Sequence, residues 1–181
     1  MQRNMTSAKS YLILFNIAKL QNFGSLIRTA NAFGAEVVYA GKRDYSRCGA
    51  TAKTRRTPAK HFFTLSEAIG FVREKGCQVV GVEIMEDATA IDQIKFAGST
   101  AFMIGNEGTG LTEDQKELCD SFVYIPQFGT AVSLNVNVAT GIVLHHFATW
   151  AGFDEAPQSG HKFETDFLPD DYLKELHGHS E

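Results

Sequence analysis

The chain has 181 residues, enough for one domain that buries a core without disulfides or metal. Its 17 basic and 21 acidic residues give a formal net charge of -4, which argues against a protein that binds nucleic acid over its whole surface. Cys48, Cys77 and Cys119 are far apart and form no CxxC pair, so neither a disulfide framework nor a zinc site is indicated. The longest early apolar run, residues 11–15, is too short for a signal peptide or a membrane span. We expect a soluble intracellular protein, in the cytoplasm, with no metal and no membrane contact.

Five short apolar runs, residues 11–15, 36–40, 78–82, 100–104 and 122–125, are typical of buried strands. Between them we predict helices over residues 23–33, 65–75 and 113–119. Their caps are, in order, Asn22, the capping box Thr64-x-x-Glu67 and the box Thr112-x-x-Gln115. The alternation predicts an α/β fold, a mostly parallel sheet with helices on both faces. Ligands of such sheets bind beyond the carboxyl ends of the strands.

The last long helix, predicted over residues 134–150, is apolar on more than one side. Val138 and Ile142 lie on one side, and Val143 and Phe147 lie on another. A helix with two apolar sides needs two packing partners, so we interpret one side as the interface of a homodimer. Full burial inside a monomer is the alternative. After residue 150 the composition turns acidic, and we expect a single domain over residues 1–150 followed by a peripheral acidic tail over residues 151–181.

A basic segment over residues 41–61 carries seven of the seventeen basic residues and a single acid, Asp44. Uncompensated like charge of this kind favours contact with a polyanion such as RNA, although a solvated loop without a partner is the simpler alternative. The candidate RNA-binding residues are Lys42, Arg43, Arg47, Lys53, Arg55, Arg56 and Lys60.

Three further segments are unusual. Residues 121–136 run from a strand through a polar loop into an apolar helix that begins near Ser133 and Asn135. The free backbone N–H groups at such a helix start can bind a polar ligand. The simpler alternative is that Ser133 or Asn135 is only the N-cap of the helix. The loop 105–110 is rich in glycine but fits no phosphate-binding pattern, because Glu107 would repel a pyrophosphate. Arg28 is a lone cation in an apolar helix, either paired with an acid or poised for a phosphate.

Together these segments resemble the SpoU (TrmH-type) branch of the SPOUT RNA 2′-O-ribose methyltransferases. The motif N-x-G-x-x-x-R-x-A begins at Asn22, G-x-E-x-x-G-L begins at Gly105, and I-P-x-x-G followed by S-L-N-V begins at Ile125. The order and spacing agree over about residues 11–150. Two positions depart from the pattern: Gln127 replaces a common methionine, and Asn137 stands where a small residue is frequent.

The resemblance implies a deep C-terminal trefoil knot over about residues 100–150, an obligate dimer and S-adenosyl-L-methionine as the cofactor, leaving S-adenosyl-L-homocysteine as product, with no metal. It also implies a catalytic group and a set of cofactor-binding residues. The implied catalytic residues are Asn22, Arg28, Glu107, Ser133 and Asn135. The implied cofactor-binding residues are Val82, Ile104, Gly105, Asn106, Gly108, Ile125, Pro126, Ser133, Leu134 and Asn135.

The implied reaction moves a methyl group from a sulfonium to a ribose 2′-hydroxyl of structured RNA, and compactness favours tRNA over rRNA as substrate. A guanidinium holds its proton too tightly to be a good base. We therefore expect Arg28 to anchor phosphate and to stabilise the developing oxyanion, either in its own chain or across the dimer. The alternatives are a non-catalytic RNA-binding or assembly module with the same fold, and a doubly wound small-nucleotide binder. The missing phosphate-loop lysine disfavours the second alternative.

Overall fold

The computed structural model describes residues 8–15, 20–42, 59–106, 108–159 and 162–163. A seven-stranded sheet lies at the centre of the first compact unit, Met1–Ala151. Its strands are β1 (Ser10–Phe15), β2 (Glu36–Ala40), β3 (Lys60–Phe62), β4 (Gln78–Val82), β5 (Thr89–Ala90), β6 (Thr100–Ile104) and β7 (Ser121–Tyr124). The order is β3-β2-β1-β6-β4-β7-β5, and every pairing is parallel, so all the strand carboxyl ends lie at one edge. The predicted α/β sheet is confirmed.

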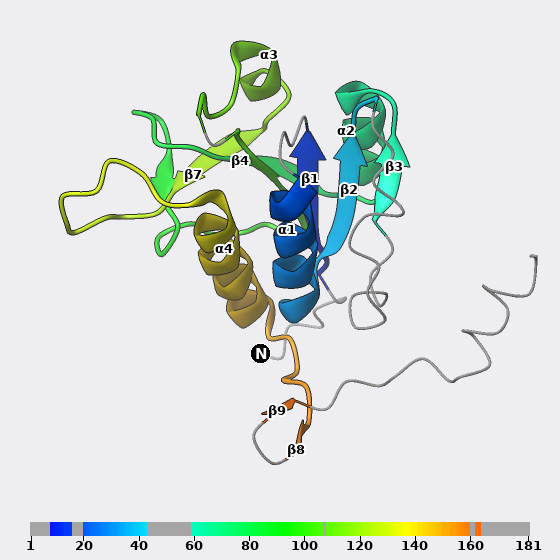
Figure 1. Cartoon of the computed structure of the whole chain (residues 1–181), viewed down its shortest axis with the longest axis vertical. Helices are drawn as coiled ribbons and strands as arrows, with labels where there is room; N and C mark the ends of the chain where they lie inside the picture. The colour runs from blue at the N-terminus through cyan, green and yellow to red at the C-terminus, as the bar shows by residue number, and fades with distance from the viewer. Residues whose placement is uncertain (1–7, 16–19, 43–58, 107, 160–161, 164–181) are drawn as a thin grey trace, which may run out of the picture. The chain divides into compact units, whose positions relative to one another are not determined.

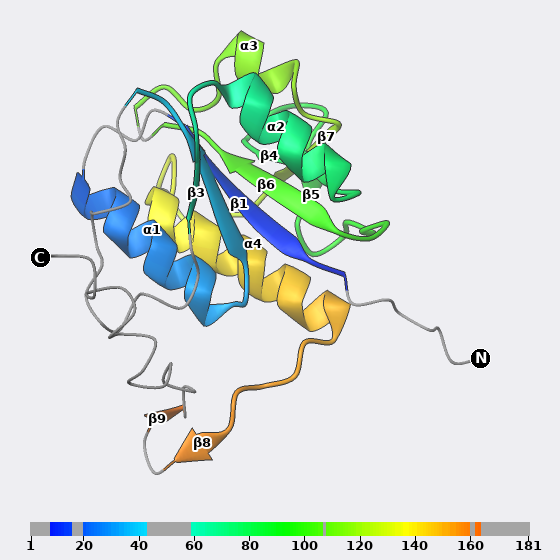
Figure 2. The same cartoon turned by 90° about the vertical axis from the view of Figure 1, so that its right-hand side faces the viewer.

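Helices cover both faces of this sheet (Figures 1 and 2). On one face α1 (Leu20–Ala32) packs against α4 (Val136–Ala151). On the other face lie α2 (Leu65–Glu74) and the short α3 (Glu113–Lys116). The side chains of β1 divide between the two faces, as the alternation of a strand requires. Tyr11 and Ile13 join the core beneath α2.

The core beneath α1 and α4 is rich in aromatic side chains. Phe102 of β6 contacts Phe147 of α4 edge to face, with ring centroids 5.7 Å apart. Phe96 contacts both rings, and Phe23 of α1 contacts Tyr39 of β2. These buried rings fix α4 against the sheet, which matters because the amino end of α4 reaches the strand carboxyl ends.

The predicted helix bounds need correction. The first helix begins at Leu20, so Asn22 lies inside it and is not its cap. The last helix begins at Val136, two residues later than predicted, because Asn135 caps it. The box at Thr64 forms as predicted, with Thr64 N donating to Glu67 Oε2 and Glu67 N donating to Thr64 Oγ1. Strands β3 and β5 were not predicted.

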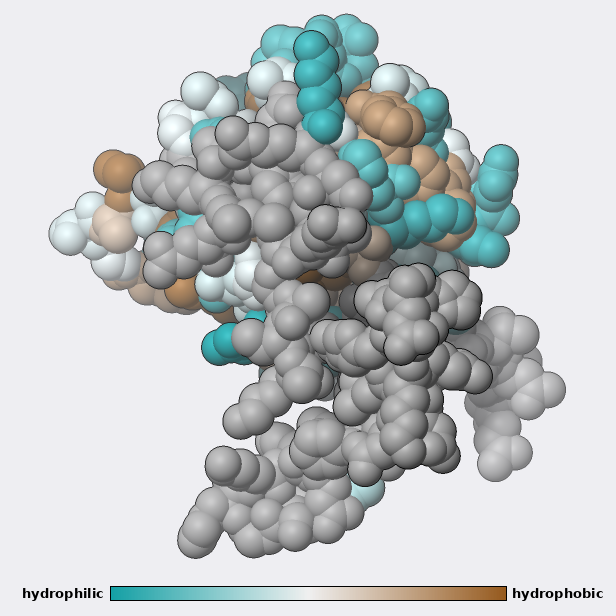
Figure 3. Space-filling view, turned by 45° about the vertical axis from the view of Figure 1, so that its right-hand side comes forward, coloured by the Kyte–Doolittle hydropathy of each residue, from teal (hydrophilic) through white to brown (hydrophobic). Residues whose placement is uncertain are grey.

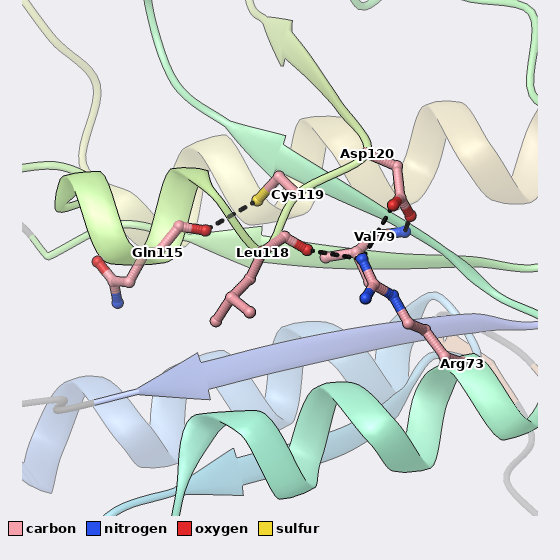
Figure 4. A network of polar contacts seen from close by, with 6 residues as sticks. All are labelled: Arg73, Val79, Gln115, Leu118, Cys119 and Asp120. Carbon is pink, nitrogen blue, oxygen red and sulfur yellow. Dashed lines mark hydrogen bonds and ion pairs between the residues drawn. The ribbon is translucent and has the colours of Figure 1, made fainter.

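A polar network ties α2 to the connection that leads into β7 (Figure 4). Arg73 Nη2 donates to Asp120 Oδ1 at 3.0 Å and to the carbonyl of Leu118 at 3.2 Å. The other oxygen of Asp120 accepts from Val79 N at 2.8 Å, and Asp120 N donates to the carbonyl of Val79 at 2.8 Å. The network therefore fixes the start of β7 beside β4, and β7 leads directly to the candidate site.

The second compact unit, Gly152–Glu181, contains an antiparallel pair, β8 (Gln158–Ser159) and β9 (Lys162–Phe163). Most of the acidic tail predicted over residues 151–181 lies outside the described residues. Among the described helices, none has the length and apolar character needed to cross a membrane.

Apolar side chains are not confined to the core. On the face seen in Figure 3, hydrophilic surface is interrupted by separate apolar patches. The exposed apolar side chains include Phe63, Phe128 and Val132. On α4, Val138 is 50% and Ile142 is 38% exposed, whereas Val143 and Leu144 are buried. The monomer therefore covers only part of the apolar surface of α4, and full burial within one chain is wrong.

Candidate active site

A cavity of about 500 Å³ opens at the carboxyl ends of the central strands. Three chain segments build it: the end of β4, the loop after β6, and the loop from β7 into the first turn of α4. The lining residues are Val82, Glu83, Ile84, Ile104, Gly105, Asn106, Gly108, Gly110, Tyr124, Ile125, Gln127, Ser133, Leu134, Asn135, Val136 and Ala139. The volume lies within the ~300–1,000 Å³ typical of small-molecule sites.

The loop after β6 turns back on itself in a tight, hydrogen-bonded hairpin. Asn106 N donates to the carbonyl of Gly110 at 3.0 Å, and Gly110 N donates to that of Asn106 at 2.9 Å. The side chain of Asn106 also accepts from Gly108 N at 2.9 Å. A Cβ at position 105 would overlap the backbone of Gly110, so the turn needs glycine there.

Glu83, the residue after β4, holds this loop from the side. Its Oε2 accepts from Leu111 N at 2.7 Å, and its Oε1 accepts from Ile84 N at 3.1 Å. Gly110 has a φ of +66°, and a Cβ there would overlap Glu83 Oε2. The glycine therefore supplies both the left-handed backbone and the space for the carboxylate. Glu83 also places a negative charge on the cavity wall.

The amino end of α4 closes the opposite part of the cavity. The carbonyl of Asn135 accepts from Ala139 N at 3.0 Å, and its side chain accepts from Asn137 N at 2.9 Å. Asn135 is thus the N-cap of the helix as well as a lining residue. Asn137 Oδ1 accepts from Thr29 Oγ1 at 2.8 Å, which joins α4 to α1 one residue beyond Arg28.

The structure brings together nine of the ten predicted cofactor-binding residues. Pro126 is the one that does not line the cavity. Ser133 and Asn135 of the predicted catalytic group lie on the wall. Asn22 and Arg28 are on α1 and do not line the cavity of their own chain, and Arg28 is exposed. Glu107 lies outside the described residues.

Most of the predicted RNA-binding segment also lies outside the described residues: Arg43, Arg47, Lys53, Arg55 and Arg56, together with Cys48. Its two ends are described. Lys42 is exposed, and Lys60 places its Nζ 3.9 Å from the ring centroid of Phe71, a cation–π contact.

Seven lining residues are outside the predicted cofactor-binding set, and Glu83 is the most informative of them. The other six are Ile84, Gly110, Tyr124, Gln127, Val136 and Ala139. A carboxylate directly after a buried parallel strand is a recognisable signal, because strand carboxyl ends gather at one edge of the sheet. Its partner, Leu111 N, is 28 residues away, and no spacing in the sequence indicates that contact.

The chemistry of the wall suits an organic cation with an apolar portion better than a metal or a thiol reaction. Val82, Ile104 and Leu134 offer apolar contact, and Glu83 offers negative charge. Within the described residues, no group of three His, Cys, Asp or Glu side chains could hold a metal ion. Burial raises the pKa of the Cys77 thiol to about 11 and that of Cys119 to about 12, so both are protonated at neutral pH.

The profile of the SpoU rRNA methylase family matches residues 9–145, most of the chain and every segment of this cavity. The chain belongs to the SpoU family. The predicted family is therefore confirmed, and two of the three motifs that carried the prediction, those that begin at Gly105 and at Ile125, meet at the cavity.

Relatives with assigned names support this membership. The chain is 36% identical over 140 residues to the 23S rRNA (guanosine-2′-O-)-methyltransferase RlmB of Coxiella burnetii, covering 74% of this chain and 56% of the relative. It is 29% identical over 133 residues to the tRNA (guanosine(18)-2′-O)-methyltransferase of Escherichia coli, covering 71% and 58%. The chain thus spans little more than half the length of these relatives.

Solved structures share the fold. One is the AdoMet-bound rRNA methyltransferase of Sinorhizobium meliloti, with a TM-score of 0.66 at 26% identity over 78% of this chain and 56% of that one. Another is the SpoU methyltransferase AviRb of Streptomyces viridochromogenes in complex with AdoMet, with a TM-score of 0.66 at 27% identity over 82% and 60%.

Proposed function

We propose that this chain binds S-adenosyl-L-methionine in the cavity at the strand carboxyl ends and methylates a ribose 2′-hydroxyl of structured RNA. The observation that carries the proposal is the convergence of two SpoU motifs, those that begin at Gly105 and at Ile125, on one cavity whose apolar walls and Glu83 carboxylate suit a cationic nucleoside. The names of the SpoU relatives, which act on 23S rRNA and on tRNA, give the substrate class.

When bound, the cofactor supplies an electrophilic methyl group on a sulfonium. The protein residues would do the rest by position and charge. Asn135 caps α4 through its side-chain oxygen, which leaves its N–H₂ group as the donor that it would offer to the site. Ser133 stands beside it on the wall as a second short polar group. We assign to this pair the shaping of the cofactor and ribose sites, with Glu107 and Asn22 orienting the loop and the arginine.

Arg28 would anchor an RNA phosphate and stabilise the developing oxyanion. Because Arg28 does not line the cavity of its own chain, we propose that it acts in the cavity of a second copy. The exposed Val138 and Ile142 on α4 support such a dimer, since four-residue spacing places them on one stripe of the helix. The basic segment that ends at Lys60 would contribute further phosphate contacts.

The deep knot also belongs to this proposal. Strand β7 pairs with both β4 and β5, although β4 and β5 precede it and are joined by only six residues. A later segment is therefore inserted between two earlier, connected ones. This arrangement supports threading of residues 100–150 through a preceding loop.

Methyl transfer to RNA tests the proposal. Purified protein is mixed with methyl-labelled cofactor and either total tRNA or total rRNA, and the RNA is digested to nucleosides for mass spectrometry. Label in a 2′-O-methylnucleoside is the expected result, and label in the tRNA pool is what our preference for tRNA predicts. Cofactor binding with no label in either pool would favour the non-catalytic RNA-binding module.

A further inference from the structure

Gln127 lies in the loop after β7 and lines the cavity. Its side-chain oxygen Oε1 is buried from solvent and accepts no hydrogen bond within the described part of the chain. Gln127 also occupies the position at which the sequence departs from the methionine common in the SpoU pattern. A polar side chain has thus replaced an apolar one at a buried point on the wall.

The other side-chain carbonyl and carboxylate oxygens on the wall have structural partners. Glu83 accepts from two backbone N–H groups, and Asn106 and Asn135 each accept from a backbone N–H two residues ahead. Those three side chains hold the shape of the cavity. Gln127 Oε1 stabilises no loop in this way.

Leaving a buried acceptor unpaired costs free energy, so buried polar atoms without a partner in the fold are uncommon. An acceptor on the wall of a ligand cavity recovers this free energy when the ligand donates to it. S-adenosyl-L-methionine carries donors of the right kind in its adenine amino group, its ribose hydroxyls and its ammonium group.

We infer that Gln127 is a cofactor-binding residue whose Oε1 accepts a hydrogen bond from an N–H or O–H group of the bound methyl donor. The inference rests on the proposed function, because the donor is a group of that cofactor.

The substitution Gln127→Met tests this contact, because it keeps the length of the side chain and restores the common family residue. The exposed Gln93, which does not line the cavity, is the matched control as Gln93→Met. Two quantities are measured for each protein: the dissociation constant for S-adenosyl-L-homocysteine by calorimetry, and the melting temperature without ligand. We expect Gln127→Met to weaken binding roughly 3- to 10-fold, as the loss of one hydrogen bond does. Its ligand-free melting temperature should equal or exceed that of the wild type, since an unpaired acceptor is removed. Gln93→Met should change neither quantity.

Unchanged affinity in Gln127→Met overturns the inference. A lowered ligand-free melting temperature, or failure of this variant to fold, also overturns it, because Gln127 would then be a residue that stabilises the fold.

Titration with S-inosyl-L-homocysteine, which lacks the adenine amino group, identifies the donor. If that amino group donates to Gln127, the affinities of wild type and Gln127→Met for the inosyl compound are equal. If a ribose hydroxyl or the ammonium group donates, the 3- to 10-fold difference persists. A wild type that binds no cofactor would instead contradict the proposed function.

Discussion

The substitution Gly110→Ala should damage the cavity through Glu83. Position 110 has a φ of +66°, and the new methyl group would overlap Glu83 Oε2 and lie 3.0 Å from its Cδ. The left-handed backbone costs a non-glycine residue about 1–2 kcal/mol. Displacing the carboxylate from Leu111 N costs about 1.5–3 kcal/mol more, because the bond involves a charged group. We expect a total loss of ~2.5–5 kcal/mol in the free energy of unfolding.

Gly76→Ala is the matched control. Gly76 has a φ of +76°, and a Cβ there meets no heavy atom within 4 Å. This variant therefore isolates the backbone term of about 1–2 kcal/mol. Urea unfolding of both variants should give a difference of ~1.5–3 kcal/mol, which is the contribution of the Glu83 contact. Cofactor affinity should fall at least roughly tenfold in Gly110→Ala and remain unchanged in Gly76→Ala.

A double mutant sharpens this experiment. Glu83→Ala removes the atoms that the new methyl group would meet, so Glu83→Ala with Gly110→Ala should be less destabilised than the sum of the single variants. We expect a coupling of at least about 1 kcal/mol, the size found for residues in direct contact. Additive effects, or equal losses in Gly110→Ala and Gly76→Ala, would refute the assignment of Glu83 as the residue that holds the loop.

Three other predictions concern packing, titration and assembly. Thr29→Val should lower the free energy of unfolding by about 0.5–1.5 kcal/mol, because its hydrogen bond to Asn137 is lost. A double-mutant cycle with Asn137→Ala, measured by urea unfolding, should show coupling between the two residues, whereas additive effects would mean that the bond contributes nothing. Burial and the charge of Glu36 raise the pKa of the Cys77 thiol from 9.0 to about 11, so the folded state holds this proton more tightly than the unfolded state. The resulting stability is present below pH 9 and is lost as pH rises toward 11. Wild type should therefore lose about 1 kcal/mol relative to Cys77→Ala between pH 8 and pH 10 in urea titrations, and parallel pH profiles would contradict the shift. Ile142→Lys should convert the proposed dimer to a monomer in sedimentation velocity, because the lysine places a charge within the apolar stripe that Ile142 forms with Val138 on α4. A dimer that persists in this variant would exclude this interface.

The parts of the fold that the sequence predicted are those that local chemistry determines. The apolar runs at residues 36–40, 78–82 and 100–104 coincide with β2, β4 and β6, because strands buried on both faces must be continuously apolar. The box at Thr64 fixed the start of α2 for the same local reason. Strands β3 and β5 are two or three residues long, too short for a hydrophobic pattern, and they exist only through pairing with β2 and β7.

The cavity was predictable as far as the motif segments extend. Gly105, Ser133 and Asn135 were found because glycine turns and helix caps have local signatures. The role of Glu83 was not predicted, because its bond to Leu111 N depends on β4 and β6 being neighbours. The start of α1 was misjudged at Asn22, where an apparent cap proved to be a residue of the first turn.

Substitution of Arg28 gives the sharpest test of the composite site. Methyl transfer to RNA and the dissociation constant for the cofactor are measured for wild type, Arg28→Ala and the control Lys95→Ala, which replaces an exposed cation that does not line the cavity. Loss of methyl transfer in Arg28→Ala, with cofactor affinity unchanged and Lys95→Ala active, is the predicted result. An Arg28→Ala enzyme that methylates RNA at the wild-type rate would contradict the proposed site.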